Sequence, residues 1–141
     1  MYDIVVLSGG FDPVHKGHVR MIRAASEMCE LLVVGVNSDS WLSRKKGKPF
    51  MEFKERLEII SSFKGVGYAV GFSDDDNSAS SLILKVRDLY PDASVAFANG
   101  GDRLLENTPE TLTCKSANVE MIWNVGGGKV QSSSSLIENS R

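Results

Sequence analysis

The sequence predicts an α/β fold in which a doubly wound parallel sheet carries helices on both faces. Short, continuously apolar runs recur along the chain, first at 4–7 and then at 31–36, and such runs are typical of strands buried on both faces. Amphipathic segments with a helical period separate these runs, and strands that alternate with helices favour a parallel sheet. The 141 residues are enough for one such domain and too few for two, so we expect a single domain over 1–141.

The individual elements follow from these patterns in chain order. The expected strands are the runs 4–7, 31–36, 68–72, 95–98 and 119–123. Three expected helices each place apolar residues on one face: Val19, Ile22, Ala25 and Cys29 on the first, Phe53, Leu57 and Ile60 on the second, Leu82, Val86 and Leu89 on the third. Thr108 followed by Pro109 is typical of a helix N-terminus and predicts a fourth helix.

Two stretches interrupt the alternation. Residues 37–49 are polar and basic, and residues 124–135 are rich in Gly and then in Ser, so we expect both to be loops. Each follows a predicted strand, and in an open α/β sheet ligands bind beyond the carboxyl ends of the strands. Both stretches are therefore candidate site loops.

Composition and charge exclude several classes of protein. Apolar residues make up 42% and charged residues 24%, which is ordinary for a globular domain and unlike a disordered chain. A net charge of −2 provides no basic field to attract nucleic acid or a membrane. Cys29 and Cys114 have no metal or disulfide-scaffold spacing, so we expect two free thiols. With no signal peptide and no stretch near the ~20 apolar residues of a membrane span, we expect a cytoplasmic protein.

The strongest candidate site lies where the first strand meets the first helix. Gly9 and Gly10 allow a tight turn and a close approach of backbone to a ligand. The following helix offers unpaired N–H groups and the positive end of its dipole, which together favour an anion. His15 and His18, three residues apart, would face that anion and donate hydrogen bonds to it. Neither the GxGxxG spacing nor the GxxxxGK[ST] spacing is present.

The segment Gly10-Phe11-Asp12 followed by His15-Lys16-Gly17-His18 resembles the HxGH signature of the cytidylyltransferase-like nucleotidyltransferases. Other segments resemble this family in the same order over nearly the whole chain: Val36-Asn37-Ser38-Asp39, Lys45-Lys46, Glu55-Arg56, Asn99-Gly100-Gly101-Asp102 and Ser132-Ser133-Ser134. The branch that contains glycerol-phosphate cytidylyltransferases and heptose-phosphate adenylyltransferases is the most similar. The resemblance implies a Rossmann-like domain that pairs as a homodimer.

The resemblance also implies a reaction. A nucleotidyl group would pass from CTP, or from ATP, to a phosphorylated alcohol or sugar by direct in-line attack on the α-phosphate, and pyrophosphate would leave. His15, His18 and Lys45 or Lys46 would act at the phosphates, and Mg²⁺ would offset the charge of the triphosphate. The implied nucleotide-binding residues are Gly9, Gly10, Phe11, Asp12, Gly17, Arg56, Gly101, Asp102, Lys129, Ser132, Ser133 and Ser134. Among them, Lys129 stands near the position where the family carries an arginine.

Several of these residues have plainer interpretations. The histidine pair would form half of a metal site, but a zinc site needs at least one further His or Cys nearby in space, and the chain contains no third histidine. The basic run 44–48 and the acidic run 74–76 are typical of solvated loops, the latter ending in a helix N-cap. Asp102 would cap a turn, and Arg56 would pair with Glu52 on a helix surface. Residues 132–135 would form a flexible tail, although the apolar Leu136-Ile137 after them favours the start of a helix.

Alternative functions stay open at this point. A nucleotide-binding module without turnover would keep the same fold, and Gly10-Phe11-Asp12-Pro13 also resembles the adenylyltransferases of NAD and coenzyme A precursor synthesis. A flavodoxin-like redox or signalling domain has no use for the histidine pair. Glycerol phosphate, an amino-alcohol phosphate and a sugar phosphate are all possible acceptors. For the site itself, we expect His15 and His18 to converge on one pocket, with Lys45 or Lys46 and a helix beginning at Ser132 on its rim.

Overall fold

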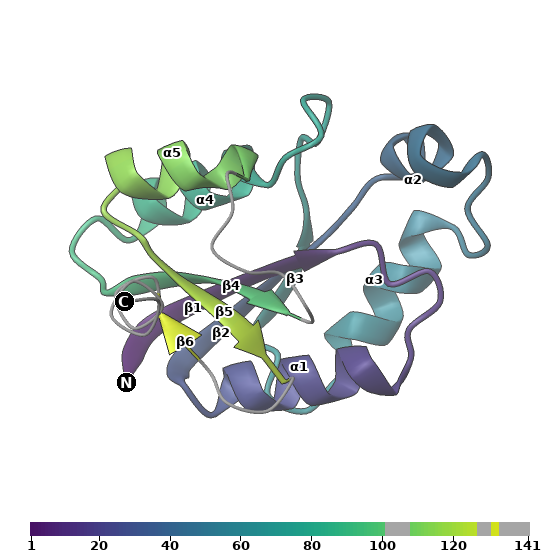
Figure 1. Ribbon diagram of the computed structural model, residues 1–141. Helices are drawn as coiled ribbons and strands as arrows, with labels where there is room; N and C mark the ends of the chain where they lie inside the picture. The colour runs from purple at the N-terminus through teal and green to yellow at the C-terminus, as the bar shows by residue number, and fades with distance from the viewer. Residues whose placement is uncertain (101–107, 127–130, 133–141) are drawn as a thin grey trace.

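The computed structural model describes residues 1–100, 108–126 and 131–132. Within them, six strands form one sheet in the order β3-β2-β1-β4-β5-β6 (Figure 1). The strands are β1 (Tyr2–Gly9), β2 (Cys29–Val36), β3 (Tyr68–Gly71), β4 (Val95–Gly100), β5 (Glu120–Val125) and β6 (Gln131–Ser132). Strands β1 to β5 are parallel to one another, and β6 is antiparallel to β5. The predicted parallel α/β sheet is confirmed, and β6 adds an antiparallel edge within the expected loop 124–135.

Helices cover both faces of this sheet. Figure 1 shows α1 (Lys16–Ser26) and α3 (Phe53–Ser61) on one face, and α4 (Ser80–Leu89) and α5 (Pro109–Ser116) on the other. The fifth helix, α2 (Asp39–Lys46), lies beyond the carboxyl end of β2. None of the helices in the described ranges is long and apolar enough to span a bilayer.

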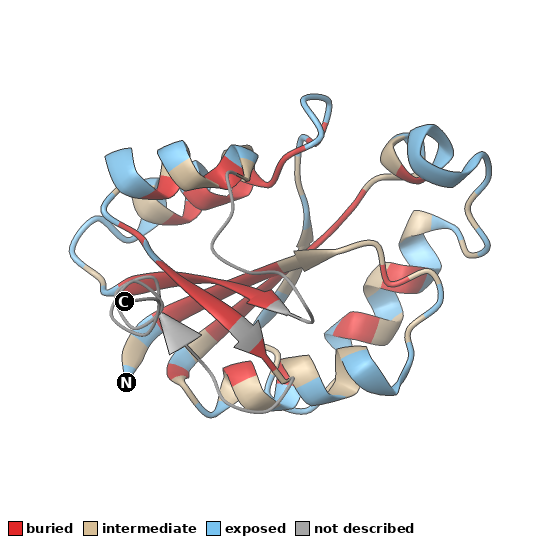
Figure 2. Ribbon diagram, viewed as in Figure 1, coloured by how far each residue is buried: buried red, intermediate tan, exposed pale blue. Residues whose placement is uncertain are grey.

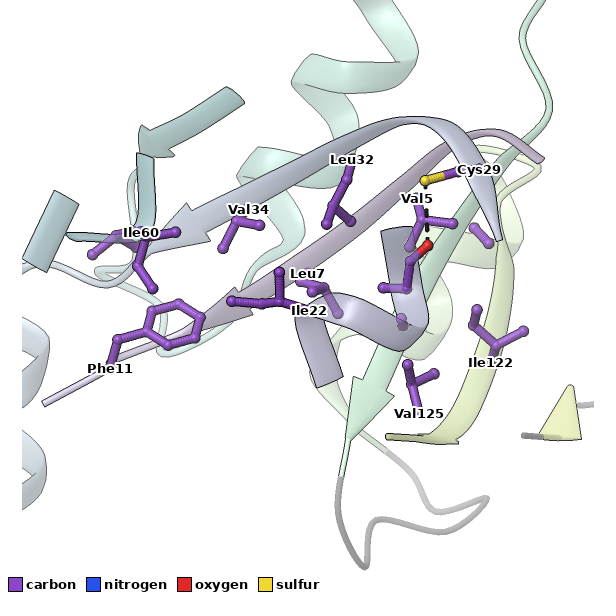
Figure 3. Packing of buried hydrophobic residues seen from close by; sticks show 14 residues of the cluster. Val5, Leu7, Phe11, Ile22, Cys29, Leu32, Val34, Ile60, Ile122 and Val125 are labelled. Carbon is purple, nitrogen blue, oxygen red and sulfur yellow. Dashed lines mark hydrogen bonds between the residues drawn. The ribbon is translucent and has the colours of Figure 1, made fainter. Parts of the chain in front are cut away.

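The core consists of two apolar layers separated by the sheet (Figure 2). On one face, Val5 and Leu7 of β1 pack with Ile22 of α1 and Ile60 of α3, and Figure 3 shows Phe11 at the end of this layer. On the other face, neighbouring residues of the same strands pack against α4 and α5. Both faces are covered, which is why residues 4–7 are apolar without alternation and are all buried.

Helix α2 lies inside a stretch that we expected to be a loop. Of its eight residues only Leu42 is buried, so no apolar face reveals the helix in the sequence. Its ends carry ordinary helix signals instead. The Ser38 hydroxyl accepts a hydrogen bond from the Trp41 backbone N–H at 3.1 Å, and Gly47, with φ of 91°, ends the helix.

The other elements begin and end close to the expected positions. Thr108 and Pro109 open α5 as predicted. Cys29 was placed on the first helix by its spacing, but α1 ends at Ser26 and Cys29 begins β2, where its thiol donates a hydrogen bond to the Ala25 carbonyl at 3.4 Å (Figure 3). Cys29 and Cys114 are both free and buried, as expected.

Candidate active site

A cavity of about 440 Å³ opens at the carboxyl ends of the strands. It lies around β1 and β4, the neighbouring strands from which the chain proceeds in opposite directions across the sheet, and this switch point is where open α/β sheets bind ligands. Residues from every surrounding element line it: Ser8, Gly9 and Gly10 at the end of β1, Asn37 after β2, Trp41 and Lys45 on α2, Asn77 to Ala79 before α4, Phe97 to Asn99 on β4, and Glu110 on α5.

The two histidines form a stacked pair at the N-terminus of α1. Their ring centroids are 3.9 Å apart. His15 Nδ1 accepts a hydrogen bond from the Gly17 backbone N–H, and His18 Nδ1 accepts one from the His15 backbone N–H, both at 3.1 Å. A neutral imidazole that accepts at Nδ1 carries its proton on Nε2, so the backbone sets the tautomer of both rings. Each ring is left with one Nε2–H donor.

His18 is held in this neutral form. Burial, together with the electrostatic influence of His15, lowers the pKa of its imidazole from 6.5 to about 4. Phe11 contributes to this burial, because its ring meets the His18 ring edge-on with centroids 4.9 Å apart. Of the residues on this side, Gly10 and Met21 line the cavity itself, while the imidazoles lie beside it. The expectation that the two imidazoles converge on the pocket is therefore not met, because neither ring lines it.

Gly17 and Gly9 allow this packing. A Cβ on Gly17 would lie 2.9 Å from Cε1 of the His15 ring. A Cβ on Gly9 would lie 3.0 Å from the Phe11 ring, which folds back because Phe11 has a φ of 52°. Both glycines therefore leave room for the aromatic groups at the turn.

The two candidate lysines lie in different surroundings. Lys45 lines the cavity, with its ammonium 4.7 Å from the centroid of the Trp41 ring. Lys46 instead pairs with the Asp12 carboxylate at 2.6 Å and donates to the Asp12 carbonyl at 2.8 Å. The geometry thus directs Lys45 to the cavity and Lys46 to the turn after β1.

Asp12 holds the segment that follows α2. Its side chain is 1% exposed, and its carboxylate accepts hydrogen bonds from the backbone N–H groups of Phe50 and Met51 at 2.7 and 2.6 Å. Although its burial opposes ionisation, these bonds and the Lys46 ammonium outweigh that effect and hold the Asp12 pKa below its usual value. The Asp12 carboxylate thus binds the protein's own backbone and Lys46, and its expected contact with a nucleotide stays a prediction.

The Arg56 side chain likewise binds other parts of the protein. It is completely buried, and its guanidinium donates to the carbonyls of Met51, Gly10 and Asn37 and to the Asp39 carboxylate, at 2.7 to 2.9 Å. The expected surface pair with Glu52 is wrong, because the guanidinium faces backbone carbonyls and Asp39 inside the protein, while a contact with the nucleotide stays a prediction. The guanidinium joins the ends of β1 and β2, from which the cavity is built.

Asp74 is a residue whose role the sequence did not indicate. We expected the acidic run 74–76 to be solvated, yet Asp74 is 2% exposed and its carboxylate accepts hydrogen bonds from the Asn37 amide, the Ser38 N–H and the Ser38 hydroxyl at 2.7 to 3.0 Å. Burial opposes its ionisation, but these bonds and nearby Arg44 hold the Asp74 pKa below its usual value. Arg44 also donates to the Asp74 carbonyl at 2.8 Å, so this loop anchors α2 from both ends. No spacing pattern in the sequence links residues 37 and 74.

The C-terminal candidates are placed only in part. Ser132 lies in strand β6 opposite Ile122, and not at the start of a helix, which corrects that expectation. Gly126 brings the chain against α1, where a Cβ would lie 2.6 Å from Cα of Met21. Gly101, Asp102, Lys129, Ser133 and Ser134 lie outside the described residues.

The described ranges contain no group of three or more His, Cys, Asp or Glu side chains able to hold a metal ion. Mg²⁺ is typically bound by one or two carboxylates together with substrate phosphates.

Comparisons with known proteins identify the family of the chain. A family model described as cytidylyltransferase-like matches residues 6–138. The "Bifunctional protein HldE" of Syntrophotalea carbinolica is 34% identical over 143 residues, covering 96% of this chain and 26% of that protein. The protein of the same name from Coxiella burnetii is 32% identical over 118 residues, covering 78% of this chain and 24% of that protein. The chain thus spans about a quarter of the length of these relatives.

Two solved structures share the fold. A lipopolysaccharide core biosynthesis protein from Thermoplasma volcanium superposes with a TM-score of 0.66 at 23% identity, covering 89% of this chain and 97% of that one. A bifunctional NMN adenylyltransferase/ADP ribose pyrophosphatase from Francisella tularensis, complexed with AMP and a Mn ion, gives 0.60 at 18% identity, covering 87% of this chain and 37% of that one. With the family model matching from β1 to within three residues of the end of the sequence, the chain belongs to the cytidylyltransferase-like family.

Proposed function

We propose that this chain transfers a nucleotidyl group from CTP or ATP to a phosphate monoester of a small alcohol or sugar. The observation that carries the proposal is the pair of Nε2–H donors, fixed by backbone hydrogen bonds, at a helix N-terminus beside the cavity. Two neutral donors and a positive dipole end suit a phosphoryl group whose charge grows in the transition state. The family of the chain supports this class of chemistry.

The proposed reaction is one in-line displacement. An oxygen of the acceptor's phosphate forms a bond to the α-phosphorus, and the bond from that phosphorus to the bridging oxygen of the β-phosphate breaks. Pyrophosphate leaves with that electron pair. A phosphate monoester has its second pKa near 6, so the attacking oxygen is already ionised at neutral pH and no general base is needed. Positioning and charge stabilisation supply the catalysis.

Each proposed residue has a task in this step. His15 and His18 would donate from Nε2 to oxygens of the α-phosphate and hold them through the displacement. Lys45 would bind phosphate oxygens from the α2 side of the cavity. Mg²⁺ would enter with the triphosphate and neutralise part of its charge. The nucleotide would also be bound by Asp102, Lys129 and Ser132 to Ser134. The chain would assemble as a homodimer.

The test is pyrophosphate release. Purified protein is given CTP or ATP with Mg²⁺ and, in turn, glycerol 3-phosphate, phosphoethanolamine and sugar phosphates, beside the His18→Asn variant. We expect release that requires one nucleotide and one acceptor and falls at least about 100-fold in the variant. Asp75→Asn serves as a matched control, since Asp75 is exposed and distant from the histidine pair in sequence.

Two outcomes would contradict the proposal. Tight nucleotide binding without turnover on any acceptor would favour the binding module that keeps the fold and has lost catalysis. Equal release by wild type and His18→Asn would remove the histidine pair from the chemistry.

A further inference from the structure

Glu110 places a buried carboxylate at the cavity. The residue is 6% exposed, lies in the first turn of α5 and lines the cavity wall. Its Oε2 accepts a hydrogen bond from the Ala79 backbone N–H at 2.8 Å, which caps α4. Its Oε1 is buried and has no hydrogen-bond partner among the described residues. A buried carboxylate oxygen without a partner is costly, so this atom requires a donor that the described protein does not supply.

The charges around the cavity restrict what that donor can be. Lys45 and the N-terminus of α1 attract phosphate, whereas the Glu110 carboxylate repels it. Ligand phosphates therefore belong near Lys45 and the histidines, and the group beside Glu110 is an uncharged hydrogen-bond donor. Both substrates of the proposed reaction carry such groups as hydroxyls, on the ribose of the nucleotide and on the alcohol or sugar of the acceptor.

We propose that Glu110 is a specificity-determining residue whose Oε1 accepts a hydrogen bond from a substrate hydroxyl group. This inference rests on the proposed function and deepens it, because it assigns the recognition of a hydroxylated substrate to one atom. A site built to bind a hydroxyl rejects the analogue that lacks it, since the buried partner is then left unpaired. We expect such discrimination to be at least about tenfold in kcat/KM.

The variant Glu110→Gln separates this role from the capping of α4. Its amide oxygen can still accept from Ala79 N–H, and its amide nitrogen then stands where Oε1 was, so an acceptor is exchanged for a donor with little change in shape. Wild type, Glu110→Gln and the control Asp75→Asn are compared on matched pairs. For the nucleotide, the pairs are ATP with 2′-deoxy-ATP and CTP with 2′-deoxy-CTP. For the acceptor, they are glycerol 3-phosphate with propyl phosphate and glucose 1-phosphate with its 2-deoxy analogue.

We expect wild type and Asp75→Asn to prefer the hydroxylated member of at least one pair, and Glu110→Gln to reduce that preference, because its amide nitrogen can only donate to the hydroxyl oxygen and a charge-assisted hydrogen bond becomes a neutral one. The pair that responds identifies the ribose or the acceptor as the source of the hydroxyl. Thermal unfolding verifies that the variant is folded. Where Glu110→Gln does not fold, Glu110→Asp, which withdraws the carboxylate by one methylene, is expected to lose the same preference.

An unchanged preference in every pair would overturn the inference and leave Glu110 as a helix cap. Phosphoethanolamine with ethyl phosphate is measured as a further pair, and a response confined to this pair would also overturn the inference, because the bound donor would then be an ammonium. Equilibrium binding of the same pairs, measured by calorimetry, does not need turnover. Binding discrimination that depends on Glu110 in a protein without pyrophosphate release would therefore refute the proposed reaction and retain the hydroxyl contact.

Discussion

The imidazoles of His15 and His18 stack with their centroids 3.9 Å apart, and each Nδ1 is bonded to a backbone N–H of the same helix turn. Two positively charged rings at this distance would repel each other. The arrangement therefore favours a neutral His18 ring, and hydrogen bonding at each Nδ1 leaves the two Nε2–H groups as donors. Hydrogen-bond donation at a fixed position, without transfer of a proton, is the chemistry that the pair offers.

Two substitutions of His18 should separate capping from donation. In His18→Asn the amide oxygen takes the place of Nδ1, so the hydrogen bond from His15 N–H survives while the outer donor is lost. In His18→Gln the amide nitrogen takes the place of Nε2. We expect His18→Asn to lower kcat about 100- to 1,000-fold with little change in Tm, and His18→Gln to retain more activity with a stability loss of about 1 kcal/mol. Pyrophosphate release and thermal unfolding measure the two effects, and the reverse order of activity would refute the assignment of the donor.

The pKa of His18 predicts how stability depends on pH. It is 6.5 in the unfolded chain and about 4 in the folded protein, so the unfolded state binds more protons between these values. The contribution of neutral His18 to the free energy of unfolding is complete above pH 6.5 and is lost as the pH falls towards 4. Urea unfolding of wild type and His18→Asn from pH 4 to 8 isolates this group from Asp12 and Asp74, which both proteins share. We expect the stability difference between them to shift in favour of the variant as pH falls, and a constant difference would contradict the lowered pKa.

Much of the fold was predictable because its signals are local. The apolar runs of β1 and β2 reflect burial on both faces of a central strand, and Thr108-Pro109 is a helix start in any context. Helix α2 was missed for a physical reason. It is held by polar contacts of its ends with Asp74 and Arg56, and only Leu42 enters the core, so no apolar period marks it.

The site was predictable in its residue types and not in their partners. His15, His18 and Gly17 follow from one short motif, since residues three apart on a helix are neighbours. The separation of Lys45 from Lys46 depends on Asp12, 34 residues away from Lys46, and the role of Arg56 depends on carbonyls of three different segments. Such pairings arise only when the sheet brings the strand ends together.

Gly17→Ala should reduce activity without reducing stability. The new Cβ would lie 2.9 Å from Cε1 of His15, so the ring has to turn away. Turning the ring away breaks the hydrogen bond from Gly17 N–H to His15 Nδ1, which costs about 1 kcal/mol, and the preference for alanine over glycine in a helix, also about 1 kcal/mol, offsets this loss. We expect kcat to fall at least about tenfold while the midpoint of urea unfolding changes little. Activity equal to that of wild type would show that the position of the His15 ring is not important.

Lys45→Met should mainly lower activity, whereas Lys46→Met should mainly lower stability. Loss of Lys45 removes the ammonium at the cavity, and we expect kcat/KM to fall about 10- to 100-fold with unchanged stability. Loss of Lys46 leaves the buried Asp12 carboxylate without its cation, and we expect about 1 kcal/mol of destabilisation with a smaller effect on kcat/KM. Steady-state kinetics and urea unfolding on both variants provide the comparison. A larger kinetic effect in Lys46→Met would reverse the assignment of the two lysines.

Arg56→Lys should be strongly destabilising although it keeps the positive charge. The guanidinium reaches the carbonyls of Gly10, Asn37 and Met51 from one planar group, whereas an ammonium on a flexible stem cannot satisfy all three. Carbonyls left unpaired in the interior cost about 1–3 kcal/mol each, so we expect the free energy of unfolding to fall by about 3 kcal/mol. Lys54→Met, an exposed substitution on the same helix, is the control and should change the free energy of unfolding by less than about 0.5 kcal/mol.

Because Gly10 and Asn37 line the cavity, the fraction of Arg56→Lys that stays folded should also bind nucleotide more weakly. Unaltered stability in urea unfolding would mean that the three carbonyls find other partners, and that Arg56 does not hold the ends of β1 and β2 together.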